Sequence, residues 1–259
     1  MAGLISFNRF GSYGRLGNMM FQYSTVLGVS KMLGMLPVVN LSQDPFFKKA
    51  FNLSRVGDTV LYNCEIGYSE QSFSFQKEIF ELDSRKNTNI DGYFQSSKYF
   101  NHCKNDILDE FTFSKDIRIE AAKKIPEDVC VSVHIRRGDY TKVSHVHTNL
   151  DEQWYRTAIS KFEGYIPVFF SDDIEWVKKT FSDIQGAVFI ENENDINLDP
   201  NLSSDQSAYI DMCAMSFCNA HIMANSSFSW WASYLSGART IAPKQWFGSS
   251  GPKNWSDRS

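Results

Sequence analysis

Apolar segments alternate with polar, glycine-containing segments along most of the chain. Short runs rich in Val, Ile, Leu and Phe predict strands, and longer stretches with apolar residues at helical spacing predict helices. The predicted strands are 4–7, 36–41, 129–135, 167–170, 187–190, 221–224 and 240–242. The predicted helices are 18–35, 154–162, 173–181, 205–218 and 228–235. Residues 42–114 show few clear periods, and we assign no elements there.

This alternation predicts an α/β protein. The β-branched run 129–135 is typical of a strand buried on both faces, and strands that alternate with helices favour a parallel, doubly wound sheet in the C-terminal half. The N-terminal end begins like a second βαβ unit. We therefore divide the chain into domains 1–125 and 126–259. Ligands of such sheets bind at the carboxyl ends of the strands, so polar residues directly after a strand are the first to examine.

Composition excludes several classes of protein. The 259 residues are 42% hydrophobic and 22% charged, which is ordinary for a soluble globular protein. A net charge of −4 argues against a general nucleic-acid binder. There is no signal-peptide pattern and no apolar run of transmembrane length, so we expect a cytoplasmic protein without a transmembrane segment; peripheral membrane association stays open. The five cysteines are expected to be buried free thiols.

The segment 134–140, His-Ile-Arg-Arg-Gly-Asp-Tyr, follows a predicted buried strand. Arg136 and Arg137 provide planar, permanently charged groups that suit phosphate oxygens. Gly138 would allow a tight turn or a close approach to a ligand. The alternative is an Arg–Asp ion pair that closes the sheet, with His134 as a core histidine. Adjacent arginines at the end of a buried strand favour an anion site.

Two further polar segments follow predicted strands. In Ser171-Asp172-Asp173 the carboxylates could recognise guanine, could cap the next helix, or could hold Mg²⁺ beside a diphosphate. In the segment 225–231, Asn-Ser-Ser-Phe-Ser-Trp-Trp, the serines could cap a helix, and the same helix start could bind a phosphate through its backbone N–H groups.

Other candidate motifs are weaker. The loop 11–18 is rich in glycine but matches neither the dinucleotide-binding nor the P-loop pattern. His145 and His147 lack partners at metal-ligand spacing, and we expect no metal site there.

Four blocks in this order resemble α1,2-fucosyltransferases of glycosyltransferase family eleven: residues 14–23, 134–140, 171–173 and 225–231. Met19 departs from the pattern, since relatives usually carry Gln there. The resemblance implies a GT-B-like architecture, with two Rossmann-type halves facing a cleft and the donor in the C-terminal half. It implies transfer of L-fucose from GDP-β-L-fucose to the 2-hydroxyl of a terminal β-galactoside, with inversion and without metal or other cofactor.

Roles for individual residues follow from this resemblance. The catalytic candidates are Arg136, supported by His134, and Asp139, which is expected to orient an arginine rather than act as a base. No general base is assigned. The donor-binding residues are expected to be Arg136, Arg137, Gly138, Asp172, Asp173, Asn225, Ser226, Ser227 and Phe228. The acceptor side or cleft is expected to include Gly17, Asn18, Gln22 and Tyr140.

Two alternatives stay open. One is another GDP-sugar transferase with a different linkage. The other, suggested by Met19, is a non-catalytic protein that binds GDP or a glycan on the same scaffold.

Overall fold

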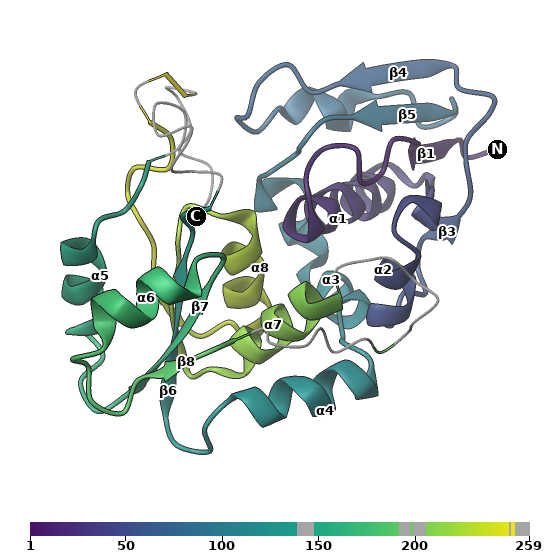
Figure 1. Ribbon diagram of the computed structural model, residues 1–259. Helices are drawn as coiled ribbons and strands as arrows, with labels where there is room; N and C mark the ends of the chain where they lie inside the picture. Colours follow the sequence, from purple (N-terminus) through teal and green to yellow (C-terminus); the bar gives the residue numbers. More distant parts are fainter. Residues whose placement is uncertain (139–147, 192–197, 199–205, 249, 252–259) are drawn as a thin grey trace. The chain divides into compact units, whose positions relative to one another are not determined.

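The computed structural model describes residues 1–138, 148–191, 198, 206–248 and 250–251, and these residues form two compact units (Figure 1). Among them, unit 1 comprises residues 1–114, and unit 2 comprises the residues from Lys115 onwards. The helix Lys115–Lys124 packs on the helix Gln206–Phe217, and Lys124 Nζ lies 2.7 Å from Asp211 Oδ1. These contacts place the helix in unit 2, whereas the division predicted after residue 125 puts it in the N-terminal domain.

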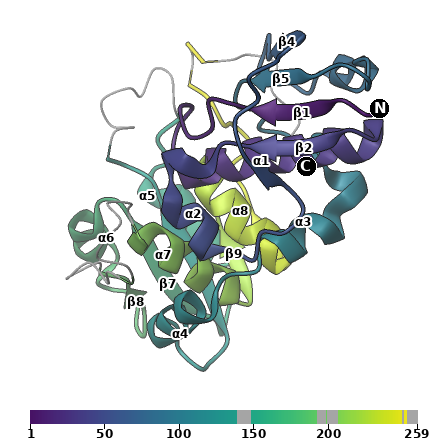
Figure 2. The ribbon, with the colours of Figure 1, turned by 90° about the vertical axis from the view of Figure 1, so that its right-hand side faces the viewer.

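Unit 1 is built on a five-stranded parallel sheet with the order β3-β2-β1-β5-β4 (Figure 2). Its strands are β1 (Leu4–Phe7), β2 (Leu36–Val39), β3 (Gly57–Asp58), β4 (Ile66–Ser69) and β5 (Thr88–Asp91). Its helices are α1 (Leu16–Leu33), α2 (Pro45–Ala50) and α3 (Lys104–Glu110), with short 3-10 turns at Leu41–Gln43, Lys77–Glu81, Ser97–Tyr99 and Asn101–Cys103. The predicted helix 18–35 ends early because Gly34, at φ +70°, takes the left-handed conformation that stops a helix.

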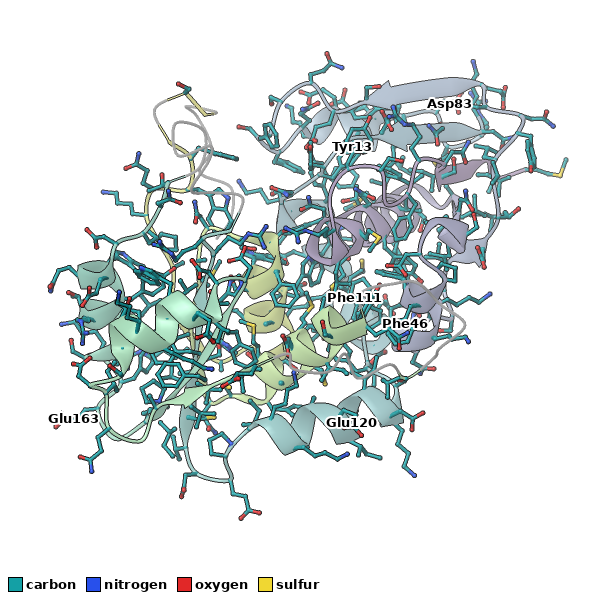
Figure 3. All side chains as sticks on the ribbon, in the orientation of Figure 1. Tyr13, Phe46, Asp83, Phe111, Glu120 and Glu163 are labelled. Atoms are coloured by element: carbon teal, nitrogen blue, oxygen red, sulfur yellow. The ribbon has the colours of Figure 1, made fainter. Side chains whose placement is uncertain are left out.

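Aromatic side chains fill the core of unit 1. Tyr23, Phe47 and Phe111 are fully buried, with ring centroids 5.5–6.1 Å apart. Phe46 and Phe111, labelled in Figure 3, come from α2 and from the end of α3, and both are buried. Met19, the departure from the family pattern, is also buried, at 5% exposed. Much of the aromatic content of the chain therefore serves packing.

One buried carboxylate ties α3 to the rest of unit 1. Glu110 is fully buried, and its oxygens accept hydrogen bonds from the Ser54 hydroxyl at 2.8 Å and from the Ser54 and Arg55 backbone N–H groups at 3.0–3.2 Å. Arg55 Nη1 lies 3.2 Å away, and the Tyr23 hydroxyl donates a further hydrogen bond. Burial and this contact raise the pKa of Tyr23. The carboxylate is thus fully partnered, as a buried charge requires.

Unit 2 contains a second five-stranded parallel sheet, with the order β10-β9-β6-β7-β8. Its strands are β6 (Cys130–Ile135), β7 (Ile166–Ser171), β8 (Val188–Phe189), β9 (Ala220–Ile222) and β10 (Arg239–Ile241). Its helices are α4 (Lys115–Lys124), α5 (Glu152–Ile159), α6 (Ile174–Phe181), α7 (Gln206–Phe217) and α8 (Ser227–Ser236). Every element predicted in this half is present within a few residues, and the α/β fold with two Rossmann-type halves is confirmed.

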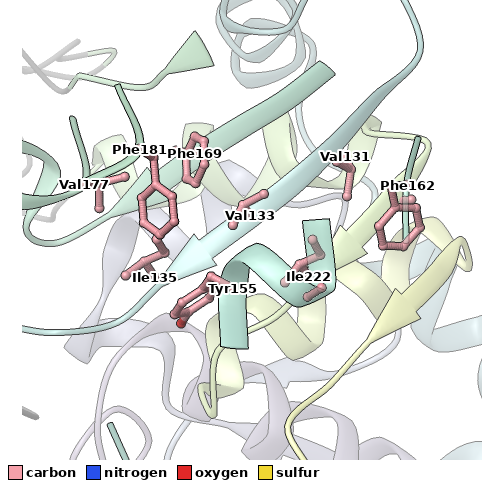
Figure 4. Packing of buried hydrophobic residues seen from close by; sticks show 11 residues of the cluster. Val131, Val133, Ile135, Tyr155, Phe162, Phe169, Val177, Phe181 and Ile222 are labelled. Atoms are coloured by element: carbon pink, nitrogen blue, oxygen red, sulfur yellow. The ribbon is translucent and has the colours of Figure 1, made fainter. Parts of the chain in front are cut away.

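The two faces of β6 have different partners. Val131, Val133 and Ile135 point to one face, where they pack with side chains of α5, β7 and α6 (Figure 4). Ser132 and His134 alternate with them and therefore point to the other face. There Ser132 Oγ lies 2.7 Å from His221 Nδ1, and His221 Nε2 lies 2.6 Å from Ser236 Oγ on α8.

Four of the five cysteines are buried as expected, whereas the expectation is wrong for Cys64. Cys103, Cys130, Cys213 and Cys218 are buried free thiols, and Cys64 is a free thiol that is exposed. No helix within these ranges is long and apolar enough to cross a bilayer.

The contribution of the buried Glu110 carboxylate to stability can be tested by substitution. In Glu110→Ala, the Ser54 and Arg55 N–H groups and the Tyr23 hydroxyl lose a buried acceptor. The free energy of unfolding of unit 1 should therefore fall by roughly 3–5 kcal/mol. Asp109→Ala is the matched control, because the Asp109 side chain is 67% exposed, and it should cost less than about 0.5 kcal/mol. Urea denaturation followed by circular dichroism measures both; equal effects would contradict the role of Glu110.

Candidate active site

Three adjacent strands of unit 2 carry the segments that the sequence analysis singled out. Strand β6 pairs with β7 on one side and with β9 on the other, and all three are parallel. Their carboxyl ends therefore lie at one edge of the sheet. The strand order also reverses here, because the chain adds β7 and β8 on one side of β6 and then β9 and β10 on the other. Such a switch point is where open parallel sheets bind their ligands.

Asp172 holds the two arginines that follow β6. Its Oδ2 lies 2.9 Å from Arg136 Nη1, and its Oδ1 accepts a hydrogen bond of 2.9 Å from the Arg137 backbone N–H. The Arg136 side chain is only 14% exposed, and a buried cation of this kind needs an anionic partner. The ion pair considered in the sequence analysis is therefore present, and it is made with the residue after β7.

Arg137 is held from two further directions. Its Nε lies 3.2 Å from Asp173 Oδ2, and its guanidinium carbon lies 3.7 Å from the centroid of the Trp176 ring on α6. Asp173 also caps α6, since its side chain accepts the Trp176 N–H. The helix-cap interpretation of Asp173 is thus observed. Trp176 was missed by the sequence analysis, because a Trp in the first turn of a helix carries no local sign that it stacks on an arginine.

Gly138 is required by the approach of Asp172. A Cβ atom at this position would lie 2.5 Å from Asp172 Oδ2. The carboxylate cannot retreat without loosening its bonds to Arg136 and Arg137. The glycine therefore lets a charged side chain pass close to the backbone.

His134 is buried beside this cluster and is neutral. Burial, the Arg136 charge and an opposing contribution from Asp172 together lower the pKa of His134 to about 4. Its ring packs on Phe228 with centroids 5.5 Å apart, which places the start of α8 beside the end of β6. Within the described ranges, its Nδ1 atom is buried with no hydrogen-bond partner. A neutral imidazole can donate to or accept from a ligand at that atom.

The segment after β9 begins with a buried, hydrogen-bonded asparagine and continues into a partly exposed helix start. The Asn225 amide donates to the carbonyl oxygens of Thr148 at 2.8 Å and Trp246 at 2.7 Å. Ser226 caps α8 by accepting the Phe228 N–H at 3.3 Å. Ser226, Ser227 and Phe228 are partly exposed, whereas Trp230 and Trp231 are buried. Asn225 therefore orients the helix start, and the N-terminal turn of α8 faces outward with its positive dipole end.

Two of the predicted site residues cannot be placed in this cluster. Asp139 and Tyr140, like His145 and His147, lie outside the described residues. Among the residues that are described, no three His, Cys, Asp or Glu side chains converge as a metal site would require. The expectation of a metal-free, cofactor-free reaction stays a prediction.

Gly17, Asn18 and Gln22 lie in unit 1, at the start of α1. Gln22 is fully buried, and its amide accepts the Gly11 N–H at 3.2 Å and donates to the Tyr13 carbonyl at 3.3 Å, so it holds the glycine-rich loop. Asn18 Oδ1 accepts a hydrogen bond from Gln95 Nε2. Their assignment to the acceptor side stays a prediction.

Comparison with known sequences identifies a family and several relatives. The family model described as "Glycosyl transferase family 11" matches residues 1–253. An "Alpha-1,2-colitosyltransferase" of Escherichia coli is 34% identical over 60% of this chain and 55% of its own length. The human "Galactoside alpha-(1,2)-fucosyltransferase 1" is 25% identical over 88% of this chain and 65% of its own length. The chain thus spans a little over half to two thirds of these relatives.

Solved structures share the fold at low sequence identity. The NodZ α-1,6-fucosyltransferase soaked with GDP-fucose superposes with a TM-score of 0.60 and 13% identity, covering 91% of this chain and 93% of the other. POFUT1 in complex with GDP gives a TM-score of 0.59 and 14% identity, covering 94% and 99%. Fucosyltransferases of this kind are GT-B-type, which supports the architecture predicted from the sequence.

Gly138→Ala tests the arrangement around Asp172. The new methyl group should push the Asp172 carboxylate away from Arg136 and Arg137, which leaves a buried cation poorly paired. The free energy of unfolding of unit 2 should therefore fall by about 1–3 kcal/mol. Gly67→Ala is the matched control, because a Cβ at Gly67 meets nothing within 4 Å, and it should be close to neutral. Urea denaturation followed by circular dichroism measures both variants. Wild-type stability in Gly138→Ala would contradict the close approach of Asp172 to the backbone.

Acid should destabilise unit 2 through two buried histidines. Burial lowers the pKa of both His134 and His221 to about 4, whereas the unfolded chain protonates them near pH 6.5. The unfolded state therefore binds more protons between pH 6.5 and 4, and stability falls as the pH falls through this window. Between pH 7.5 and 5 each should cost about 2 kcal/mol.

Urea denaturation at the two pH values measures this loss. All six tryptophans follow residue 114, so tryptophan fluorescence reports on the C-terminal part of the chain. The variant His221→Gln should lose less stability on acidification than the wild type, whatever its stability at pH 7.5. An identical acid loss in the variant would show that His221 does not titrate in this way.

Proposed function

The chain belongs to glycosyl transferase family 11, and on that premise we propose that it is an inverting fucosyltransferase. The proposed reaction moves L-fucose from GDP-β-L-fucose to the 2-hydroxyl of a terminal β-galactoside without a metal ion. Curated relatives named galactoside α-(1,2)-fucosyltransferases, which align over 88% of this chain, support the linkage. The metal-free mechanism rests on the arginines.

The observation that carries the proposal is the position of Arg136 and Arg137 at the switch point of unit 2. A carboxylate oxygen of Asp172 lies 2.9 Å from Arg136 Nη1, and one of Asp173 lies 3.2 Å from Arg137 Nε. A guanidinium has five N–H donors, so a carboxylate on one side can orient it for a second anion on another. The two arginines and the start of α8 together suit a diphosphate.

The reaction places negative charge where these groups lie. The acceptor oxygen attacks C1 of fucose on the face opposite GDP, the bond from C1 to the β-phosphate oxygen breaks, and its electron pair leaves with GDP. The acceptor hydroxyl proton passes to a base that we leave unassigned. Arg136 is the leading donor to the β-phosphate, supported by Arg137, neutral His134 and the Ser226–Ser227 helix start. Inversion converts the β-linked donor into an α-linked product.

A second candidate differs in the donor sugar. The relative named α-1,2-colitosyltransferase is 34% identical, against 25% for the human galactoside α-(1,2)-fucosyltransferase. Colitose is the 3-deoxy counterpart of L-fucose, so either donor presents the same diphosphate. The ratio of kcat/KM for GDP-fucose to that for GDP-colitose separates the two candidates.

Arg136→Ala tests the proposed mechanism. Loss of the charged donor should lower kcat for fucose transfer by about 10²–10³-fold, because the leaving phosphate loses its main stabilising group. The assay uses GDP-fucose with lactose, N-acetyllactosamine and lacto-N-biose in EDTA, and NMR of the product gives the linkage. Lys178→Ala is the control. It removes a cation on α6 that pairs with Glu175 and Glu191 rather than with the Asp172–Asp173 pair, and it should leave kcat unchanged.

Near-normal turnover by Arg136→Ala would overturn the role of Arg136. Strict dependence on Mg²⁺ or Mn²⁺ would revive a metal at the Asp172–Asp173 pair. GDP binding without turnover on any acceptor, with either donor, would favour a non-catalytic binding protein.

A further inference from the structure

Unit 1 has a switch point of its own, between β1 and β5. The chain adds β2 and β3 on one side of β1 and later places β5 and β4 on the other. The loop after β1 carries Arg9 and Tyr13, the latter labelled in Figure 3, and β5 ends at Asp91, which Tyr93 follows closely. The rule that makes the switch point of unit 2 a candidate site makes this edge a second candidate.

Asp91 is the polar centre of this edge. Its Oδ2 accepts a hydrogen bond from the Tyr13 hydroxyl, and Arg9 Nη1 lies 3.5 Å away. The bond to Asp91 raises the pKa of Tyr13, so Tyr13 stays a donor. In the described part of the chain, the other oxygen of Asp91, Oδ1, is buried and has no hydrogen-bond partner. A buried carboxylate oxygen without a donor is costly, and a ligand hydroxyl would satisfy it.

A row of three aromatic rings begins at Tyr13, whose hydroxyl binds Asp91. The Tyr13 and Tyr93 ring centroids lie 5.4 Å apart, and the Phe73 ring lies 5.3 Å from Tyr93. Arg9 lies 5.0 Å from the centroid of the Tyr13 ring. Aromatic faces pack against the C–H faces of a sugar, and an ionised carboxylate accepts hydrogen bonds from its hydroxyls. This combination suits a neutral sugar.

The turn that presents Asp91 and Tyr93 has a fixed and strained shape. Phe94 is fully buried at φ +51°, which is unfavourable for a residue with a side chain. The Glu70 carboxylate, after β4, accepts the backbone N–H groups of Tyr93 at 2.7 Å and Phe94 at 3.0 Å. Gly92 is required beside it, because a Cβ there would lie 2.5 Å from Glu70 Cβ. Strain of this kind is retained where a site depends on it.

We propose that Asp91, with Tyr13 and Tyr93, forms the sugar subsite that binds the acceptor of the proposed reaction. Asp91 Oδ1 accepts a hydrogen bond from a hydroxyl of the acceptor sugar, Tyr13 orients the carboxylate, and Tyr93 packs against the ring. Glu70 acts as a positioning residue through the turn. The subsite rests on the proposed function and assigns the acceptor to residues of unit 1.

Asp91→Asn tests the subsite. The amide keeps the size of the side chain but loses its charge, so the acceptor KM should rise by roughly 10-fold or more while the donor KM and GDP affinity stay within about twofold. Tyr13→Phe should raise the acceptor KM by a smaller factor. The matched control is Asp109→Asn, at an exposed carboxylate of the same unit, which should change neither constant.

Saturation-transfer NMR with the same galactosides in the presence of GDP supplies a readout that does not need turnover. If the wild type transfers sugar and folded Asp91→Asn keeps the wild-type acceptor KM and NMR signal, the subsite is wrong and the proposed function stands. If the wild type transfers from neither donor, the function fails, and the subsite is judged on binding alone. Galactoside binding that Asp91→Asn abolishes then supports it, and no binding to the wild type overturns it.

Discussion

The hydrogen bonds and ion pair of Asp172 are the constraint on which the proposed donor site depends. One carboxylate fixes the guanidinium of Arg136 and the backbone N–H of Arg137, at 2.9 Å each. It comes so close to the chain that only glycine fits at position 138. Since Asp172 follows β7 and the arginines follow β6, the parallel pairing of these strands is what brings the groups together. A preorganised cation pair at a sheet edge needs no rearrangement when an anion arrives, which is the property that stabilises a leaving group.

Much of unit 2 could be predicted because its signals are local. The β-branched run before His134 marks a buried strand, and polar residues at the ends of β6, β7 and β9 must meet if the sheet is parallel. The partners themselves could not be predicted, since Arg136 and Asp172 are far apart in sequence. Asp139 was expected to orient an arginine; in the described residues Asp172 and Asp173 do so.

Unit 1 was harder to predict for physical reasons. Strand β3 has only two residues, and β4 is an edge strand with exposed positions, so neither leaves a strong hydrophobic pattern. The turn after β5 depends on Glu70, which precedes it by more than twenty residues, and on a left-handed Phe94 that no propensity favours. Both sheets nevertheless place charged and aromatic groups at the point where strand order reverses. The net charge of the whole chain therefore says little about these two edges, because the cations and carboxylates there are paired with one another.

The proposed role of Arg136 is to bind the terminal phosphate of GDP, and a comparison of two ligands on two proteins isolates that contact. Calorimetry gives the affinities of GDP and GMP for the wild type and for Arg136→Ala. The wild type should prefer GDP over GMP by at least about 10-fold, and the variant should lose most of this preference. A preference for GDP that is the same in both proteins would contradict it, because the β-phosphate would then be bound by other groups.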